Sequence, residues 1–311
     1  MASATADEAL AIADAELDAR GVASIIDHDR PLGPLTTYRV GGPAARFVVA
    51  EAVDHLLAVA AARLPVLVIG RGSNMLVADR GFRGIAVQLG TSFAAIDVDD
   101  CVVRAGAAAS LPVVARRSAS AGCTGFEWAV GVPGSIGGAV RMNAGGHGSD
   151  MAAVLVDATV VDLGGSGRID RRTAAELHLG YRSSSVGAGD AVIAATLQLA
   201  PGDADESART IEEIVRWRRE NQPGGQNAGS VFTNPPGDSA GRLIDTAGCK
   251  ALRVRTAHVS PKHANFIQAD ENGSADDVHA LMLLVRERVR AVHGIELEPE
   301  TRMVGFAEES S

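Results

Sequence analysis

The fold class is decided by one stretch, Pro65-Val66-Leu67-Val68-Ile69-Gly70-Arg71-Gly72-Ser73-Asn74. Its apolar, β-branched first half predicts a buried strand that stops at Gly70. The small residues that follow expose backbone N–H groups, which can bind a pyrophosphate. A Rossmann fingerprint would require a third glycine at the position of Met75, and a helix where the chain continues with β-prone residues. A Rossmann fold is therefore disfavoured and, taken alone, the motif favours a tight turn.

Short strand patterns dominate the first two-thirds of the chain. Apolar or alternating runs predict strands within residues 36–50 and at 85–89, 101–105, 152–162 and 191–199. Helical spacing predicts helices at residues 6–20, 53–62 and 111–121. Many short strands mixed with few helices indicate an α+β fold.

The last third of the chain has a clearer helical pattern. Residues 201–205 are predicted to be a linker, and an amphipathic helix follows them. A second helix is predicted from Ser274, which resembles a capping box with Asp277, to a C-terminal stop at Gly294. A short strand at residues 295–297 should follow this helix.

Composition places the chain among globular proteins large enough for two domains. It has 311 residues, of which 46% are hydrophobic and 22% are charged, so packed cores are expected. The net charge of -9 argues against nucleic-acid binding carried by bulk electrostatics. A local arginine cluster can still bind an acidic ligand within an acidic protein.

The cysteines and histidines give no sign of a metal site. Cys101, Cys123 and Cys249 are odd in number and lack a CxxC motif, so buried free thiols in a reducing compartment are expected. The eight histidines form no ligand cluster, and no metal is predicted. The acidic N-terminus does not resemble a signal peptide, and Arg63 and Pro65 interrupt the longest apolar stretch. We therefore expect a cytoplasmic protein.

A dense run of small residues spans residues 131–140, and Asn143-Ala144-Gly145-Gly146 continues it. Six of these ten residues are Gly, Ser or Pro, so a large flat ligand and its phosphates could lie against the backbone. A flexible linker is the alternative. The interleaved Val132, Ile136 and Val140 argue against that alternative and favour ligand binding.

A second glycine-flanked stretch, Ala228-Gly229-Ser230-Val231-Phe232-Thr233-Asn234-Pro235, presents a serine on a turn. Glycine accepts torsion angles that other residues do not, so backbone can approach a ligand closely there. The stretch is weak evidence by itself. It gains weight because it occurs in a fixed order with the stretches at 70–74, 131–143 and 297–300.

Several charged residues are candidates for a site, and each also has a structural explanation. Arg182 suits a carboxylate or phosphate because its guanidinium is bidentate, although a lone arginine is more often a surface residue. Glu298 and Glu300 would share one face of a strand, either as an acid pair or as a solvated edge. Arg218 lies in a basic run that could contact phosphate or end a solvated helix, and Lys262 lies in a turn before a strand.

Together these stretches resemble the UDP-N-acetylenolpyruvoylglucosamine reductases of bacterial peptidoglycan synthesis. The matching segments cover about residues 30–304 and are residues 37–43, 70–74, 125–145, 181–183, 227–232, 241–245, 262–267 and 297–300. The resemblance implies a FAD-binding domain of the vanillyl-alcohol oxidase type and then a smaller α+β substrate-binding domain. The expected division is an N-terminal helical segment at 1–30, the FAD domain at 31–202, the substrate domain at 203–305 and a disordered tail at 306–311.

The resemblance implies an NADPH-dependent flavoenzyme that reduces the enolpyruvyl ether of UDP-N-acetylglucosamine enolpyruvate to UDP-N-acetylmuramate. Non-covalent FAD would deliver hydride from N5 to C3, and Ser230 would give a proton to C2. Arg182 and Glu300 would bind and polarise the substrate carboxylate, the arginine stabilising the negative charge that develops. Such an enzyme serves cell-wall biogenesis, cell shape and cell division.

The same resemblance assigns the binding residues. The predicted FAD contacts are Arg39, Gly70, Arg71, Gly72, Ser73, Asn74, Gly131, Pro133, Gly134, Ser135, Gly138 and Asn143. The predicted substrate contacts are Arg218, Asn234 and Lys262. Beyond the UDP-sugar and NADPH, no nucleic acid, membrane or obligate protein partner is expected.

Two features depart from the pattern of the family. Glu220-Asn221 occupies a place where relatives often carry a lysine, so another cation, with Arg218 as a candidate, would contact the substrate diphosphate. The short segment 181–191 indicates the subgroup without the substrate-closing tyrosine loop. A flavin-dependent sugar or alcohol oxidase and a non-catalytic UDP-sugar-binding protein are the alternatives. Neither would need all three predicted catalytic residues.

Overall fold

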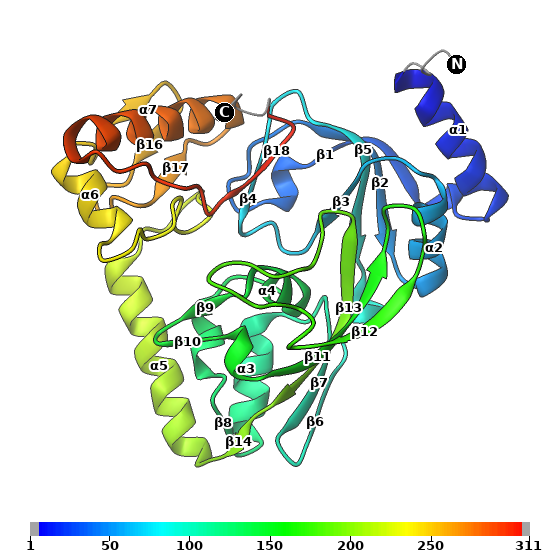
Figure 1. The fold of residues 1–311 in the computed structure, drawn as a ribbon, viewed down its shortest axis with the longest axis horizontal. Coiled ribbons are helices and arrows are strands. Elements are labelled where there is room, and N and C mark those ends of the chain that lie inside the picture. Colours follow the sequence, from blue (N-terminus) through cyan, green and yellow to red (C-terminus); the bar gives the residue numbers. More distant parts are fainter. Residues whose placement is uncertain (1–5, 307–311) are drawn as a thin grey trace. The chain divides into compact units, whose positions relative to one another are not determined.

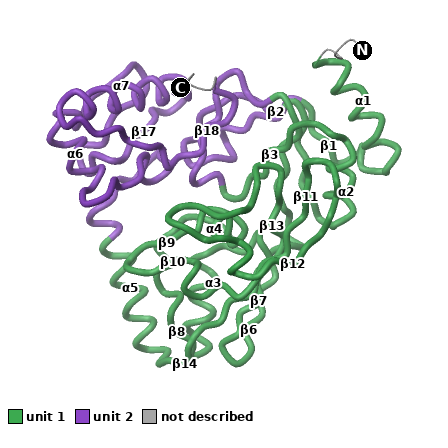
Figure 2. Tube along the Cα trace, viewed as in Figure 1, with its two compact units in different colours: residues 1–28, 45–71, 83–217 green, residues 29–44, 72–82, 218–311 purple. Residues whose placement is uncertain are grey.

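The structure is a computed structural model that describes residues 6–306 of the chain. Residues 1–5 and 307–311 lie outside the described part, and so does most of the predicted tail at 306–311. The chain divides into two compact units, each assembled from segments far apart in the sequence (Figure 2). Unit 1 comprises residues 1–28, 45–71 and 83–217, and unit 2 comprises residues 29–44, 72–82 and 218–311. The functional division expected at residues 202 and 203 stays a prediction.

Unit 1 contains a five-stranded antiparallel sheet (Figure 1). In spatial order its strands are β12 (Ile169–Thr173), β11 (Leu155–Asp162), β13 (Asp190–Gln198), β7 (Val102–Gly106) and β6 (Ile96–Asp99). The central strand β13 pairs Ala195 with Ala158 of β11, and Leu197 with Val103 of β7. Strands β7, β11 and β13 confirm three of the predicted strands.

Two helices contribute to the hydrophobic core beside this sheet. Helix α3 (Leu111–Ser120) buries Leu111, Val114 and Ala115, which recur at helical spacing. Helix α4 (Ile136–Met142) buries Ile136 and Val140 in the same cluster. The second half of the segment rich in small residues is therefore a helix anchored in the core, which excludes a flexible linker there.

A second sheet has the strand order β1-β2-β5-β3. Its strands are β1 (Ile26–Pro31), β2 (Pro43–Ala50), β5 (Phe82–Leu89) and β3 (Val66–Ile69). Helices α1 (Ala6–Ala19) and α2 (Val53–Ala61), both predicted, contribute to the adjacent hydrophobic cluster. Strand β3 is confirmed, but its complete burial is not. It lies at the sheet edge, so its first three residues are half-buried and only Ile69 is buried.

Unit 2 is built around a three-stranded sheet and two helices. These elements are β15 (Arg253–Val254), β16 (Ala257–Val259), β17 (Ile267–Ala269), α6 (Ala240–Thr246) and α7 (Ala275–His293). Helix α7 confirms its prediction, because the Ser274 Oγ accepts from the Asp277 N–H at 3.2 Å and Gly294 ends the helix with φ of +69°. The capping box is half formed, since the Asp277 carboxylate instead accepts from Thr256 Oγ1 at 2.7 Å.

A parallel pair of strands, β4 (Met75–Val77) and β18 (Arg302–Val304), joins distant segments of unit 2. The strand predicted at residues 295–297 is wrong, because the chain there has no regular pairing. Pro299 instead makes an isolated bridge with Phe232. Glu298 and Glu300 therefore do not share the face of a regular strand. Proline lacks the N–H that a ladder needs, so pairing resumes only at β18.

The predicted linker at residues 201–205 is also wrong. It contains the end of β14 (Ala200–Pro201), which pairs with β8 (Cys123–Thr124), and the start of α5 (Ala204–Asn221). The Asp203 side chain explains the early helix start, because its Oδ1 accepts from the Glu206 N–H at 2.8 Å. The last boundary between the two units falls inside α5, after residue 217.

Short elements complete the described chain. The strands β9 (Gly145–Gly146) and β10 (Ser149–Asp150) form a small hairpin. Turns of 3-10 helix are η1 (Ala23–Ile25), η2 (Gly33–Leu35), η3 (Thr91–Phe93), η4 (Glu127–Gly131) and η5 (Met151–Ala153). Among the helices of residues 6–306, none combines the length and apolar character needed to cross a membrane.

The structure corrects the prediction for the cysteines. Cys101 and Cys123 form a disulfide with a Cα–Cα distance of 5.4 Å. Of the three cysteines, all within the described residues, Cys249 alone is free, and burial raises the pKa of its thiol. The pairing had no sequence signal, since the two half-cystines meet only when the segment after α3 lies against the turn that precedes β7.

Candidate functional site

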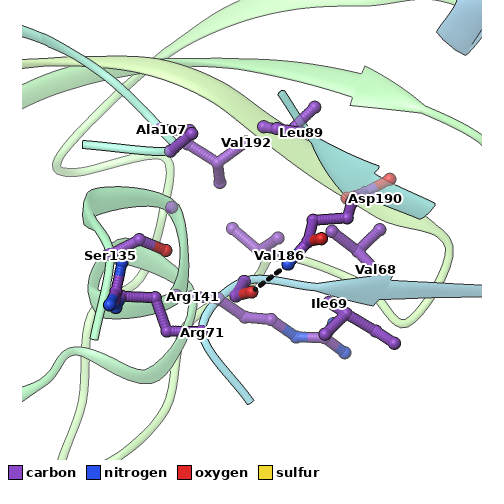
Figure 3. Close-up of a pocket in the computed structure, with 15 residues that line it drawn as sticks. Val68, Ile69, Arg71, Leu89, Ala107, Ser135, Arg141, Val186, Asp190 and Val192 are labelled. Atoms are coloured by element: carbon purple, nitrogen blue, oxygen red, sulfur yellow. Dashed lines mark hydrogen bonds between the residues drawn. The ribbon is translucent and has the colours of Figure 1, made fainter. Parts of the chain in front are cut away.

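The loop after β3 forms part of a cavity in unit 1 with a volume of about 160 Å³ (Figure 3). Other walls come from β5, from β13, and from α4 with the residue before it. Four of the predicted FAD contacts line this cavity: Gly70, Arg71, Ser135 and Gly138. The fold thus brings together two small-residue stretches that lie far apart in the sequence.

Glycine has a steric role at three positions around the cavity. A Cβ at Gly70 would lie 2.8 Å from the Ser135 Oγ, and one at Gly137 would lie 2.9 Å from the Ala107 Cβ. At Gly138 an added Cβ would meet only the Ser135 Oγ, at 4.0 Å. Because Gly138 lines the cavity, a side chain there would enter it. Because glycine has no side chain, these positions keep the space available for a ligand.

The cavity combines apolar walls with charged groups (Figure 3). Its apolar residues include Val68, Leu89, Val186 and Val192, and its charged residues are Arg71, Arg141 and Asp190. The Gln88 Nε2 donates to the Gly70 carbonyl at 3.1 Å, and the Asp190 carboxylate accepts from the Gly187 N–H at 3.0 Å. Apolar surface for a ring beside guanidinium groups for phosphate suits a nucleotide.

Sequence reasoning missed three polar residues of this cavity: Gln88, Arg141 and Asp190. Gln88 and Asp190 lie on strands that looked like ordinary sheet, and Arg141 lies on a helix that the segment rich in small residues concealed. One of the three had a sequence signal. Asp190 follows glycines at 187 and 189, and an aspartate in such a segment often fixes a turn by accepting from its backbone, as Asp190 does here.

Three predicted FAD contacts in the loop before α4 do not line the cavity. Gly131 is buried at the end of η4, whereas Pro133 is exposed. The Gly134 carbonyl accepts from the Leu111 N–H at 3.1 Å, which ties the loop to the start of α3. Their contact with the cofactor stays a prediction.

Asn143 is buried, and its side chain makes three hydrogen bonds within unit 1. It ends α4 in the left-handed conformation, with φ of +40°. Its Nδ2 donates to the Gly180 carbonyl at 2.9 Å and to the Asp150 carboxylate at 3.2 Å, while its Oδ1 accepts from the Ala152 N–H at 2.9 Å. Its predicted contact with FAD stays a prediction, and its observed role is to join α4 to the turn that carries Arg182.

Arg182 lies in a tight turn of unit 1. Gly180 and Ser183 exchange both backbone hydrogen bonds, and Arg182 has a left-handed φ of +54°. Its Nη2 donates to the Gly145 carbonyl at 3.1 Å, and its Cζ lies 5.2 Å from the centre of the Tyr181 ring. A positive φ is unfavourable for arginine, so the bonds around the turn hold this side chain in a defined direction.

Ser230 lies in unit 2 between two fixed points of backbone. Before it, Gly229 has φ of +79°, and its N–H donates to the Asn227 Oδ1 at 3.1 Å. After it, the Val231 N–H donates to the Asn265 carbonyl at 2.9 Å. Ser230 itself is half-buried, so its hydroxyl is held on an ordered turn.

Glu300 lies beside this turn within unit 2. Its N–H donates to the Val231 carbonyl at 2.8 Å, so the segments of Ser230 and Glu300 are directly hydrogen-bonded. Asn74, predicted as a FAD contact, donates from Nδ2 to the Glu300 carbonyl at 3.1 Å. The structure therefore brings together two of the three predicted catalytic residues within one unit, and Arg182 belongs to the other unit.

The remaining predicted FAD contacts also lie in unit 2. A Cβ at Gly72 would meet the Leu35 carbonyl oxygen at 2.2 Å, so packing requires glycine there. Arg39 is exposed and has φ of +56°, and its N–H donates to the Thr36 Oγ1 at 3.1 Å. Ser73 is half-buried between Gly72 and Asn74. The cofactor contacts of Arg39, Gly72 and Ser73 stay predictions.

Two of the predicted substrate contacts gather at the C-terminal end of α5. Arg218 donates from Nε to the Gln222 Oε1 at 2.8 Å, and burial lowers the pKa of its guanidinium. Lys262 donates from Nζ to the Arg219 carbonyl at 2.7 Å, which places an ammonium group at the last turn of α5. Asn234 lies apart from them in sequence, and its Oδ1 accepts from the Ala240 N–H at the start of α6, at 3.0 Å.

Comparison with known families defines the class, an oxidoreductase with a FAD-binding domain followed by a smaller second domain. Residues 45–170 match the family described as FAD binding domain, and this range includes the cavity-lining residues from Val68 to Arg141. Residues 221–304 match the family described as UDP-N-acetylenolpyruvoylglucosamine reductase, C-terminal domain. The second match includes both Ser230 and Glu300.

The chain belongs to the UDP-N-acetylenolpyruvoylglucosamine reductase family. The reductase of Rubrobacter xylanophilus is 41% identical over 89% of this chain and 94% of its own length. The reductase of Acidiphilium cryptum is 43% identical over 90% of this chain and 92% of its own. The crystal structure of the reductase from Thermus caldophilus is similar with a TM-score of 0.78 and 35% identity, over 90% of this chain and 98% of that one. The predicted α+β fold and family are confirmed.

Proposed function

We propose that this chain reduces the enolpyruvyl ether of UDP-N-acetylglucosamine enolpyruvate to UDP-N-acetylmuramate, with FAD as cofactor and NADPH as reductant. Membership of the reductase family supports the reaction. The observation that carries the proposal is the direct hydrogen bond, 2.8 Å long, between the segments of Ser230 and Glu300. Two adjacent backbone segments that carry a serine hydroxyl and a carboxylic acid suit proton delivery to a carbon next to a carboxylate.

The residues of unit 1 fit part of a FAD molecule. Gly138 offers a place that any side chain would fill, and the apolar walls with Arg71 and Arg141 suit a ring and phosphates. We assign Gly70, Arg71, Ser135 and Gly138 to the cofactor, with Gln88 and Asp190 beside them. When bound, FAD supplies a centre that accepts hydride from NADPH and donates hydride to the C3 methylene of the substrate.

Ser230, Arg182 and Glu300 supply the remaining chemistry in this proposal. Hydride addition at C3 leaves negative charge at C2 and on the adjacent carboxylate. The Ser230 hydroxyl gives its proton to C2, which completes reduction of the double bond. Arg182 neutralises the charge on the carboxylate, and Glu300, as a neutral acid, donates a hydrogen bond to the same group. The turn around Arg182 supports this role, because its backbone is held in a conformation that arginine rarely adopts.

We further propose that Arg218, Lys262 and Asn234 bind the UDP part of the substrate. Lys262 bonds to the Arg219 carbonyl in the last turn of α5, the turn that also contains Asn221, where relatives often carry a lysine, so its ammonium group can provide the missing charge. An acidic net charge of -9 supports a small-molecule substrate rather than a nucleic acid. We place the reaction in the cytoplasm, where the chain would act without a membrane or an obligate protein partner.

An anaerobic cycle tests the function directly. The purified protein is expected to show an oxidised flavin spectrum that NADPH bleaches. UDP-N-acetylglucosamine enolpyruvate should then restore the oxidised spectrum without oxygen. One UDP-N-acetylmuramate should form for each flavin that is reoxidised. Recovery only after admission of air would indicate an oxidase, and a protein that does not bind FAD would indicate a non-catalytic role.

A further inference from the structure

We propose that Asn265 and Asn74 are positioning residues, which fix the spacing between Ser230 and Glu300. This inference rests on the proposed function, since it assumes that both residues act on the substrate. In this role the two asparagine side chains hold the backbone so that the proton donor and the carboxyl group keep a fixed distance.

Asn265 acts as a clamp on the backbone that follows Ser230. Its Oδ1 accepts from the Phe232 N–H at 3.0 Å, and its Nδ2 donates to the Phe232 carbonyl at 2.8 Å. Its own carbonyl accepts from the Val231 N–H at 2.9 Å. Asn265 is 3% exposed, so solvent does not compete for these bonds. One amide thus pairs with both backbone groups of Phe232, as a neighbouring strand would.

Asn74 acts from the opposite side on Glu300. Its Nδ2 donates to the Glu300 carbonyl at 3.1 Å, and its own carbonyl accepts from the Arg302 N–H at 3.1 Å. These two bonds extend the pairing of β4 with β18 by one step, toward Glu300. The Asn74 side chain therefore sets where the extended segment of Glu300 begins.

The two clamps meet at Val231. The Val231 carbonyl accepts from the Glu300 N–H at 2.8 Å, so a series of hydrogen bonds runs from the main-chain carbonyl of Asn265 through Val231 and Glu300 to the Asn74 side chain. The Asn265 amide holds the next residue of the same segment, Phe232. An amide can donate and accept at once, which a carboxylate or an apolar side chain of similar shape cannot. Loss of either amide should let Ser230 and Glu300 shift relative to each other, without removing a group that touches substrate.

The test measures the two half-reactions of the FAD-loaded Asn265→Ala variant by anaerobic stopped flow. Flavin content and the rate of flavin reduction by NADPH should stay within about twofold of wild type. The rate of reoxidation by saturating UDP-N-acetylglucosamine enolpyruvate should fall about 10–100-fold, because small misplacements of reacting groups have large effects on rate. The Kd of this substrate for the oxidised enzyme should change much less. Asn265→Asp keeps the size of the side chain but cannot donate to the Phe232 carbonyl, so it should give the same pattern, and it provides the answer should Asn265→Ala fail to fold.

Thr256→Val is the matched control for general destabilisation of unit 2. It removes the bond from Thr256 Oγ1 to the Asp277 carboxylate and the bond from the Ser274 N–H to that hydroxyl, both away from Ser230. It should lower the melting temperature and leave both half-reactions unchanged. Equal slowing of reoxidation in Thr256→Val and Asn265→Ala would overturn the positioning role.

A double-variant cycle separates this inference from the proposed function. If Asn265 acts through Ser230, then Asn265→Ala should slow reoxidation very little in a Ser230→Ala background. Independent, multiplying effects would overturn the inference while leaving Ser230 as proton donor. A normal reoxidation rate in Ser230→Ala alone would instead overturn the proposed function.

Discussion

The cavity of unit 1 and the turn around Ser230 in unit 2 are shaped in opposite ways. In the cavity, glycine leaves space, and a side chain at Gly138 would enter that space. Around Ser230, asparagine side chains add hydrogen bonds that the backbone would otherwise lack. Space accommodates a large cofactor, whereas added bonds fix the position of single reacting atoms.

This difference indicates that substitutions in the two regions should impair different steps of the reaction. A side chain added to the cavity should reduce FAD binding while the fold persists. A polar atom removed from the turn should slow one half-reaction while FAD stays bound. Variants that behave otherwise would show that the regions are not specialised as their geometry suggests.

The largest effect is expected for Ser230→Ala. Removal of the hydroxyl should slow flavin reoxidation by the enolpyruvyl substrate about 10²–10⁴-fold, the usual contribution of a general acid. Flavin reduction by NADPH should be nearly unchanged, because that step needs no proton from Ser230. Anaerobic stopped flow resolves the two steps. A loss of equal size in both half-reactions would contradict the assignment of Ser230 as proton donor.

A large effect of another kind is expected for Gly138→Leu. The new side chain should enter the cavity and lower FAD affinity at least about tenfold, since pocket shape governs binding. Stability should not fall, because glycine inside a helix is unfavourable by about 0.5–1 kcal/mol relative to alanine. Flavin content and urea unfolding of the apoprotein measure the two quantities. Gly224→Leu is the control, since a Cβ there meets open space in unit 2.

Local signals made several parts of the fold predictable from the sequence. Helix α7 was predicted from its Ser274 cap, its apolar spacing and the glycine at 294, all of which act within a few residues. The Ser230 turn was predicted because glycine marks a backbone that other residues avoid. The family motifs also identified four residues of the cavity.

Features that depend on distant partners were not predictable. Strand β18 forms at residues 302–304, rather than at 295–297, because β4 offers its pairing partner there. The Cys101–Cys123 disulfide depends on packing between separate segments. The roles of Asn265 and Asn74 could not be predicted either, since an amide that binds backbone far along the chain leaves no local pattern.

A smaller effect is expected for Asp79→Ala, which tests whether side-chain caps hold unit 2 together. The Asp79 carboxylate accepts from the Ala275 N–H at 2.9 Å and from the Ser274 hydroxyl, so it ties the end of β4 to the start of α7. Loss of such a cap should lower the free energy of unfolding by about 1 kcal/mol. Urea unfolding checks this value. Asp79→Asn keeps an acceptor and should lose less than half as much, whereas equal losses would show that charge, not capping, is responsible.

The smallest effect concerns pH and His263, which supports the frame around Ser230. Its Nδ1 accepts from the Asn265 N–H at 3.2 Å, and burial lowers the pKa of its imidazole below the ordinary value of 6.5. Below that value the unfolded chain takes up a proton that the folded chain resists. The stability contributed by neutral His263 should therefore be present above about pH 6.5 and should decline as the pH falls toward the lower pKa of the folded state.

Urea unfolding at about pH 7.5 and about pH 5.5 measures this decline. His263→Gln removes the titrating group, so the variant should lose less stability between the two values than wild type does. His178→Gln, at an exposed position in unit 1, should lose as much as wild type. If His263→Gln lost as much as His178→Gln, the neutral imidazole would not be needed to hold Asn265. The clamp on Phe232 would then depend on the amide alone, and the frame around Ser230 would keep its geometry at acidic pH.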